Sequence, residues 1–242
     1  MMVGVDVRPW PGVHVLDRLA GGARGTVFGA RRGDHDLVVR RSSRSPAALD
    51  WELDLVAHLA EHDLRVPLTV PSADGRRHVD GVVVQEFLPG RPPVSDDDWR
   101  AVVDLLYRMH ELTRGWPQRP GFASSRGLQH RDTGGDVDLS AMPPAAKAAV
   151  RKAWRRADTG EECAIHGDVG GGNVLVHRGV AGLIDWDESR VDLPLFDYAH
   201  RPFDVADDVV RAGVAWEAAT CWLAEPEYAA RRLDELHVLN MQ

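Results

Sequence analysis

The stretch from Ile165 to Val176 constrains most strongly what this chain can fold into. It reads Ile-His-Gly-Asp-Val-Gly-Gly-Gly-Asn-Val-Leu-Val, so a glycine-rich loop lies between two apolar segments. Glycine and polar residues favour a turn, whereas short apolar runs on either side of it favour buried strands. We therefore predict a tight loop between two buried strands that carries His166, Asp168 and Asn173.

A further carboxylate follows at Asp185, where the next apolar run ends. Phosphoryl transfer requires a carboxylate that orients the attacking hydroxyl, and an amide and a second carboxylate that hold Mg²⁺ on the triphosphate. The pattern thus favours Asp168 as the group that orients and deprotonates the hydroxyl, with Asn173 and Asp185 as ligands of Mg²⁺. Taken alone, the glycine-rich segment would usually be a plain turn, and Asp185 could cap a helix. The joint pattern favours the catalytic interpretation.

These residues resemble a known family. The segments His166-Gly167-Asp168 through Asn173, Ile184-Asp185-Trp186 and Pro194–Ala199 are similar to the aminoglycoside phosphotransferase and choline kinase-like family, small-molecule relatives of the protein kinases. The resemblance implies an α+β, bilobal protein-kinase-like fold, with an antiparallel-sheet N-terminal lobe and a mostly helical C-terminal lobe. It also implies ATP and Mg²⁺ as cofactors, with His166 bracing the catalytic loop. We expect a nucleotide-binding lobe over residues 1–88 and a catalytic and substrate-binding lobe over residues 89–242.

The composition excludes several classes of protein. The 242 residues are 44% hydrophobic, which suffices for a sizeable core, and the net charge of -8 argues against a general nucleic-acid or anionic-membrane binder. Two cysteines imply no disulfide framework, and neither a signal peptide nor a membrane-spanning run is apparent. We therefore expect a cytoplasmic protein without a nucleic-acid or membrane partner, and leave its oligomeric state open.

The N-terminal region predicts a phosphate-binding loop. Val13–Leu19 alternates like a strand and is followed by a glycine-containing turn, in which glycine lets backbone N–H groups approach phosphates. Gly22, Gly25 and Val27 match the kinase pattern Gly-x-Gly-x-x-Gly-x-Val, although Ala20 stands where its first glycine would be. We expect these three residues to contact the nucleotide, with an ordinary hairpin turn as the alternative.

The next strand and helix predict an ion pair. The apolar strand over residues 37–40 ends in Arg40, where kinases carry the lysine that touches the nucleotide phosphates; whether Arg40 does so is left open. Residues 46–62 form a helical stripe, with Ser45 as its cap and Glu52 within the apolar face. A carboxylate on a packed face requires a cation, so we expect Glu52 to pair with Arg40, the alternative being a Glu at the edge of the stripe that reaches solvent.

Two further strands lead to the lobe boundary. Prolines restrict residues 66–70 to a short edge strand, and residues 79–87 form a buried strand. The resemblance implies that Glu86, Phe87 and Leu88 offer backbone groups to adenine, a simple loop being the alternative. Later in the chain we expect helices over residues 144–157, 205–223 and 226–239, preceded by an irregular segment over residues 115–135.

Acidic residues crowd the chain after the catalytic block. Eight lie between Leu183 and Asp208, opposed only by Arg190 and Arg201. Ligation of Mg²⁺, a solvated face and attraction of a cationic substrate are the competing explanations. Asp185 belongs to the first, and Asp197 matches a family position that buttresses the catalytic loop.

The sequence therefore predicts an ATP-dependent phosphotransferase that acts on a hydroxyl of a cationic small molecule. An aminoglycoside-like antibiotic is the first candidate acceptor, which would make the protein a resistance enzyme. A kinase for a metabolite such as choline, homoserine or a sugar amine is the alternative within enzymes. A catalytically silent nucleotide-binding protein is the alternative of another class, favoured by Arg40 and Ala20. The sequence names neither the acceptor hydroxyl nor the choice between ATP and GTP.

Overall fold

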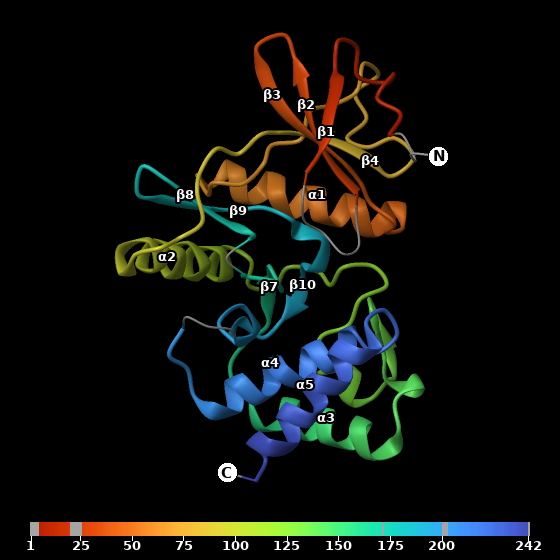
Figure 1. Ribbon diagram of the computed structural model, residues 1–242, viewed down its shortest axis with the longest axis vertical. Coiled ribbons are helices and arrows are strands. Elements are labelled where there is room, and N and C mark those ends of the chain that lie inside the picture. Colours follow the sequence, from red (N-terminus) through yellow and green to blue (C-terminus); the bar gives the residue numbers. More distant parts are fainter. Residues whose placement is uncertain (1–4, 20–25, 171, 200–202, 242) are drawn as a thin grey trace. The chain divides into compact units, whose positions relative to one another are not determined.

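The computed structural model describes residues 5–19, 26–170, 172–199 and 203–241 (Figure 1). The chain divides into two compact units, the first from Met1–Leu105 and Gly171–Asp187, the second from Leu106–Gly170 and Glu188–Gln242. The first unit thus extends beyond residue 88, where we expected a lobe to end. The reason is local, because Arg91 and Val176 exchange both backbone hydrogen bonds, at 3.1 and 2.7 Å.

The first unit contains a four-stranded antiparallel sheet. Its strands lie side by side in chain order: β1 (His14–Arg18), β2 (Thr26–Arg32), β3 (His35–Arg41) and β4 (Val82–Glu86). One face of the sheet packs into a core that contains Trp10, whose indole N–H donates to the Val70 carbonyl at 2.8 Å. Val83, on the other face, packs against Leu49 and Leu53. The predicted strands over residues 13–19 and 37–40 are confirmed.

The helix beneath this second face is α1 (Pro46–Glu61). Ser45 caps it as predicted, since its hydroxyl accepts a hydrogen bond from the Ala48 N–H, and proline suits the first helical position. Leu49, Leu53 and their neighbours on the stripe are buried, so apolar periodicity fixes which side of the helix faces the sheet.

Two expectations about the strands were wrong. Residues 66–70 form only an isolated bridge at Thr69, because prolines at 67 and 71 remove backbone donors from a regular ladder. The strand expected from residue 79 begins at Val82, because Val79 and Val82 bond to each other across a tight turn. Asp80 and Gly81 in that turn both have positive φ, of 51° and 77°, so the strand cannot begin before Val82.

A late segment of the sequence returns to the first unit as a hairpin. Its strands are β8 (Val174–His177) and β9 (Val180–Leu183), which pair antiparallel. The Leu183 N–H donates to the Arg65 carbonyl, and the Arg65 guanidinium donates to the Leu175 carbonyl at 3.0 Å. These long-range bonds explain why residues after 170 belong with the N-terminal sheet.

Helix α2 (Asp96–Leu112) begins in the first unit and ends in the second. The second unit also contains α3 (Pro144–Arg156), α4 (Asp207–Thr220), α5 (Pro226–Leu239) and two strand pairs. These pairs are β5 (Thr133–Gly134) with β6 (Val137–Asp138), and β7 (Cys163–Ile165) with β10 (Arg190–Asp192). The predicted helices after residue 144 and the strands around the loop at His166 are therefore confirmed.

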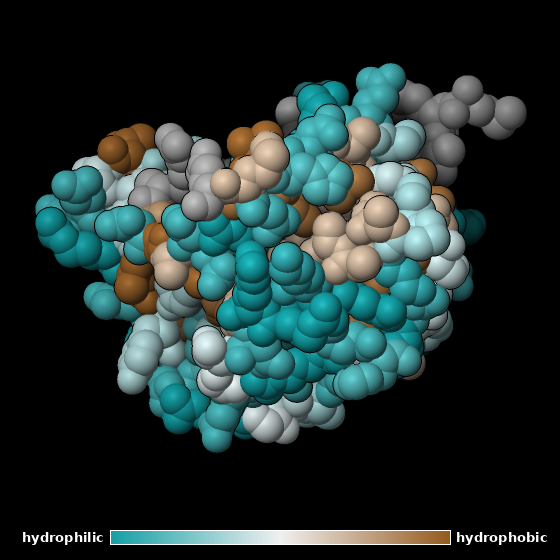
Figure 2. Space-filling view, turned by 90° about the horizontal axis from the view of Figure 1, so that it is seen from below, coloured by the Kyte–Doolittle hydropathy of each residue, from teal (hydrophilic) through white to brown (hydrophobic). Residues whose placement is uncertain are grey.

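The core of the second unit is rich in aromatic side chains. Trp154 of α3 and Phe196 both pack against Trp216 of α4, with ring centroids 5.6 and 5.4 Å from that ring. The segment from 115 to 135 is mostly irregular, as predicted, but it includes the short strand β5 and buried side chains. In the face shown in Figure 2, hydrophilic side chains cover most of the surface and hydrophobic ones lie in small groups. Within the described residues, no helix is both long and apolar enough to cross a membrane.

Candidate functional site

A cavity of about 510 Å³ lies within the first unit, and we call it the first-unit cavity. Its apolar lining comes from β2, β3 and β8 and from segments next to the strands, and a few polar side chains line it as well. Such a combination is typical of a small-molecule site. The residues that line it are Leu19, Val27, Val38, Arg40, Pro67, Gln85, Glu86, Phe87, Leu88, Gly90, Gly172, Asn173, Leu175, Ile184 and Asp185.

The predicted ion pair between Arg40 and Glu52 forms at this cavity. The Arg40 Nη2 donates to Oε1 of Glu52, and the Arg40 Nε donates to Oε1 of Gln85 at 3.1 Å. Glu52 is fully buried, so without this cation its carboxylate would carry a large desolvation cost. Arg40 lines the cavity whereas Glu52 does not, so the pair holds a guanidinium at the cavity wall.

Asn173 and Asp185 both line the first-unit cavity, as the Mg²⁺ hypothesis requires. Val174 pairs with Leu183 in the hairpin. Asn173, which precedes this pair, and Asp185, which follows it, therefore lie at the same end of the hairpin. The Ile184 N–H donates to the Asn173 carbonyl at 3.0 Å, which holds the two segments together. Asp185 adopts a positive φ of 62°, a conformation that non-glycine residues rarely take and that is common at functional sites.

The donor set fits Mg²⁺ better than a transition metal. One carboxylate and one amide oxygen suit an ion that keeps its remaining positions for water and phosphate oxygens. In the described part of the chain, no group of three or more His, Cys, Asp or Glu side chains could hold a metal by itself. Asn173 and Asp185 would therefore bind the ion together with a ligand.

The segment predicted to receive adenine lies at the edge of the first-unit cavity. The Glu86 N–H donates to the Leu68 carbonyl and the Phe87 N–H donates to the Asp36 carbonyl, so both are engaged in the protein. The Leu88 N–H has no hydrogen-bond partner among the described residues, and Leu88 lines the cavity. Of the phosphate-loop residues, Val27 also lines it, while Gly22 and Gly25 lie outside the described residues.

His166 and Asp168 belong to the second unit. His166 is fully buried, and its Nδ1 accepts a hydrogen bond from the Asp168 N–H at 3.3 Å. That contact fits a brace for the loop. The Asp168 side chain is exposed, as a group that meets a substrate must be. The first unit thus brings Arg40, Asn173 and Asp185 together, and the second carries the two residues of the predicted catalytic loop, His166 and Asp168.

Asp197 holds the backbone of this loop through hydrogen bonds, as predicted from the family position. It is fully buried and accepts from the Gly167 N–H at 2.7 Å and from the His166 N–H at 3.1 Å. The His110 Nε2 lies 2.8 Å from Oδ2 of Asp197, the same oxygen that accepts from the His166 N–H. Burial alone would raise the pKa of the Asp197 carboxyl, but the hydrogen bond to His110, the electrostatic influence of His110 and His166 and the Gly167 N–H lower it below its usual value.

Gly167 cannot carry a side chain. Its φ is +84°, and a Cβ there would lie 2.7 Å from the Glu188 carbonyl oxygen and 2.8 Å from Nη1 of Arg190. Arg190 is itself buried, with its guanidinium 3.4 Å from the centroid of the Trp216 ring. The glycine therefore lets the loop pack directly on β10.

The acidic stretch proves less available than its sequence suggests. Asp192 and Asp197 are buried, and Asp192 accepts hydrogen bonds from Ser125 and Arg190. Asp187 forms a two-pronged ion pair with Arg44, at 2.7 and 3.1 Å. Only some of the eight acidic residues in this stretch can therefore attract a substrate.

Sequence reasoning missed Gln85 and Arg44. Gln85 could have been found by alternation along β4, because it shares a face with Val83, next to Arg40. Arg44 lies 143 residues from Asp187, and nothing in the local sequence links the two.

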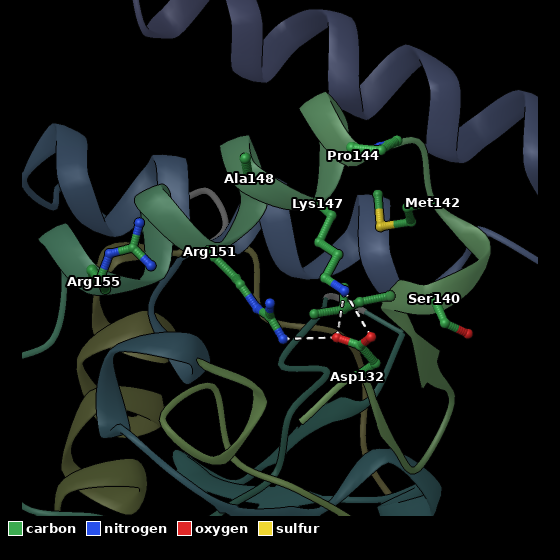
Figure 3. A pocket seen from close by; sticks show the side chains of 9 residues that line it. Asp132, Ser140, Met142, Pro144, Lys147, Ala148, Arg151 and Arg155 are labelled. Atoms are coloured by element: carbon green, nitrogen blue, oxygen red, sulfur yellow. Dashed lines mark hydrogen bonds and ion pairs between the residues drawn. The ribbon is translucent and has the colours of Figure 1, made fainter. Parts of the chain in front are cut away.

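A second cavity, of about 500 Å³, lies in the second unit beside α3, and we call it the second-unit pocket (Figure 3). In it, Lys147 and Arg151 point toward Asp132, with nitrogen to oxygen distances of 2.6 and 2.8 Å. Arg155 donates to Gln129, and Ser140 donates to Asp138. Its charged side chains are thus paired within the protein.

Known proteins share both the sequence and the fold. The sequence model of the phosphotransferase enzyme family matches residues 15–233. A homoserine kinase of Cupriavidus necator is 36% identical over 85 residues, which make up 32% of this chain and 26% of that protein. The matched segment therefore spans about a quarter of the length of that relative.

Solved structures resemble nearly the whole chain. A microcompartment-associated aminopropanol kinase superposes with a TM-score of 0.66 at 19% identity, covering 94% of this chain and 90% of that one. A spectinomycin phosphotransferase in complex with ADP and spectinomycin gives 0.59 at 10% identity, covering 94% and 92%. At such identities the likeness concerns the fold, and it confirms the bilobal α+β protein-kinase-like fold that the sequence predicts.

Proposed function

This chain belongs to the phosphotransferase enzyme family, and from that premise we propose that it transfers the γ-phosphoryl group of ATP to a hydroxyl of a small molecule. The observation that carries the proposal is the first-unit cavity, which gathers Arg40, Asn173 and Asp185 beside an apolar wall. An apolar slot with a guanidinium and two oxygen ligands at one side suits a purine nucleotide and its metal-bound triphosphate.

Each part of the nucleotide has a partner in this proposal. The base lies against the backbone of Glu86, Phe87 and Leu88, where the unbonded Leu88 N–H is available to a ring nitrogen. Val27 covers the nucleotide together with the phosphate loop that contains Gly22 and Gly25. Arg40, held by Glu52, contacts a phosphate oxygen. Asn173 and Asp185 hold Mg²⁺, which when bound neutralises charge on the phosphates.

Asp168 does the proton chemistry. Its carboxylate accepts a hydrogen bond from the acceptor hydroxyl and takes the proton as that oxygen bonds to the γ-phosphorus. The bond from the γ-phosphorus to the bridging oxygen breaks, and ADP leaves with that oxygen. His166 and Asp197 act through the loop backbone, because their hydrogen bonds hold Gly167 and Asp168 in place.

We propose a cationic acceptor, with an aminoglycoside-like antibiotic as the first candidate and resistance as the biological role. The chain carries a net charge of -8, and Asp168, Asp204 and Asp207 of the second unit remain exposed. Each contact between an ammonium group and an exposed carboxylate contributes about 0.5–1 kcal/mol, so several are needed. The spectinomycin phosphotransferase of the same fold is consistent with this choice.

A metabolite kinase is the second candidate. The 85-residue match to a homoserine kinase and the likeness to an aminopropanol kinase favour it, because both names denote small amino alcohols. Such acceptors would use the same Asp168 chemistry and differ only in how their amino group is recognised.

The test is ADP release with Mg·ATP across a panel of aminoglycosides, choline, homoserine and aminopropanol. We expect one cationic acceptor to stand out, and added salt to lower its kcat/KM mainly through KM, because salt screens the attraction of exposed charges. If no acceptor stimulates ADP release, the protein is a catalytically silent nucleotide binder. If the best acceptor is uncharged, or its kcat/KM ignores salt, the acidic residues are only a solvated surface.

A further inference from the structure

Gln85 lines the first-unit cavity, as do Arg40 and Asn173. Residues alternate along β4, and Val82 and Val84 pack into the core on one face of the sheet. Val83 and Gln85 therefore share the opposite face, which lines the cavity. Gln85 sits directly opposite Val38 of β3, with Arg40 two residues further along that strand.

Arg40 fixes the orientation of the Gln85 carboxamide. A guanidinium can only donate hydrogen bonds, so the atom of Gln85 that faces the Arg40 Nε must be the carbonyl oxygen, Oε1. Arg40 is held in turn by Glu52, so the carboxamide cannot turn over without losing a charge-assisted bond. The amide nitrogen, Nε2, must point away from Arg40.

That nitrogen has no hydrogen-bond partner among the residues that the structure describes. Gln85 is only 5% exposed, and it lines the cavity. Although the residue as a whole is buried, its Nε2 atom is not among the fully buried side-chain atoms that lack a partner in the described part of the chain, so it is accessible from the cavity that Gln85 lines. Such a donor gains a hydrogen bond when a ligand offers it an acceptor. The Nε2 group is thus a donor for whatever occupies the cavity next to Val38.

We propose that Gln85 reads the base of the nucleotide, and that it makes GTP a phosphoryl donor for this protein alongside ATP. The inference rests on the proposed function, since it assumes that a purine nucleotide fills the first-unit cavity. Guanine presents two acceptors, N7 and O6, on the edge where adenine presents the acceptor N7 and the donor N6. A donor on the cavity wall therefore bonds either base through N7, and bonds O6 of guanine alone.

An apolar side chain at position 85 could not donate a hydrogen bond to the base. It would leave O6 of guanine desolvated and unbonded, whereas a carboxylate would accept from the adenine amino group and repel O6. Because ATP and GTP share the same triphosphate, their relative use isolates the contribution of the base. Changes in how Arg40 or the metal meets the phosphates affect both nucleotides alike.

The experiment measures kcat/KM for GTP and for ATP with one saturating acceptor. In the wild type we expect the GTP value to reach at least about one tenth of the ATP value, since one neutral hydrogen bond changes affinity by roughly two- to tenfold. Gln85→Met should lower the GTP to ATP ratio by about two- to tenfold, and Gln85→Glu should lower it further, by about tenfold or more. Asp185→Ala is the matched control: it removes a proposed ligand of the phosphate-bound metal but leaves the hydrogen bond between Arg40 and Gln85 in place, so both values should fall and their ratio should stay.

A binding measurement separates this inference from the proposed function. The rise in melting temperature with GDP and with ADP requires nucleotide binding but no turnover, and it is compared between the wild type and the two Gln85 variants. A GDP shift that Gln85→Met or Gln85→Glu selectively weakens supports the inference even if no acceptor is ever phosphorylated. A wild-type GTP to ATP ratio below about one tenth, or a ratio that neither variant changes, overturns it. Should Gln85→Glu fail to fold, the Gln85→Met ratio alone decides.

Discussion

The first-unit cavity and the second-unit pocket have nearly the same volume, about 510 and 500 Å³, yet they differ in where their polar groups point. Both contain a guanidinium near a carboxylate. In the first, Glu52 is fully buried behind Arg40, so the cation still faces the cavity. In the second, Asp132 lies between Lys147 and Arg151 and takes up both cations (Figure 3).

This difference teaches that volume alone does not mark a functional site. A carboxylate such as Glu52, which does not line the cavity, holds a cation that can still contact a ligand. A carboxylate such as Asp132, which contacts two cations inside the pocket, takes up their charge, so an anion gains little by binding there. In the second-unit pocket, the bond to Lys147 and the nearby charge of Arg151 hold the pKa of Asp132 below its usual value. That pocket therefore ties α3 to the preceding irregular segment, and we propose the chemistry for the first-unit cavity and the loop at Asp168.

The largest expected effect concerns Asp168, which lies outside both cavities. Asp168→Asn removes the proposed proton acceptor but keeps the size of the side chain, so kcat should fall by about 100-fold or more. Nucleotide binding should persist, because the first-unit cavity is unchanged; isothermal titration with an ATP analogue checks this. Near-normal turnover in this variant would refute the assigned role.

The next effect tests the first-unit cavity itself. Asp185→Ala removes a proposed carboxylate ligand of Mg²⁺, so Mg²⁺ should no longer tighten nucleotide binding, and kcat/KM should fall by at least about tenfold. The measurement is the nucleotide Kd with and without Mg²⁺ in the wild type and the variant. A variant that retains the full effect of Mg²⁺ would show that the ion is held elsewhere.

A smaller effect concerns stability. Asp197→Asn replaces a fully buried carboxylate that bonds to His110 and to the Gly167 N–H, and it should lower the free energy of unfolding at pH 7 by about 3 kcal/mol. Because folding lowers the pKa of Asp197, its carboxylate stabilises the fold above its unfolded pKa of about 3.9, and this contribution is lost as the pH falls through the folded pKa. Urea unfolding of both proteins should therefore converge below about pH 4. A difference that is independent of pH would contradict this account.

The smallest expected effect is in the second-unit pocket. Asp132→Asn weakens the contacts with Lys147 and Arg151 but touches neither Asp168 nor the first-unit cavity. We expect kcat/KM to change by less than about twofold, since surface substitutions away from a site rarely matter. Steady-state kinetics check it, and a tenfold loss would break the distinction between the two cavities.

Local patterns predicted the elements that depend on neighbouring residues. Apolar runs located the strands around His166, and Ser45 with Pro46 located the start of α1. The ion pair of Arg40 and Glu52 was also predictable, because a charge on an apolar stripe demands a partner. The turn that delays β4 was not, since Asp80 and Gly81 act through their backbone conformation.

Long-range contacts set the limit of this reasoning. The acidic count suggested an open negative surface, but tertiary structure buries Asp192 and pairs Asp187 with Arg44. The donor that Gln85 presents depends on which atom Arg40 contacts, which only three-dimensional structure reveals. The roles of Gly22 and Gly25 remain predictions.

The first unit is assembled from two stretches of sequence, and this affects how such proteins can be shuffled. A single crossover after Leu105 would transfer the sheet and Arg40 but leave Asn173 and Asp185 with the other parent. A hybrid that receives the whole first unit of this chain therefore needs three coordinated crossovers, one after Leu105 and one on each side of Gly171–Asp187. Inheritance of the acceptor preference is subject to the same rule, because the second unit is divided at the same positions.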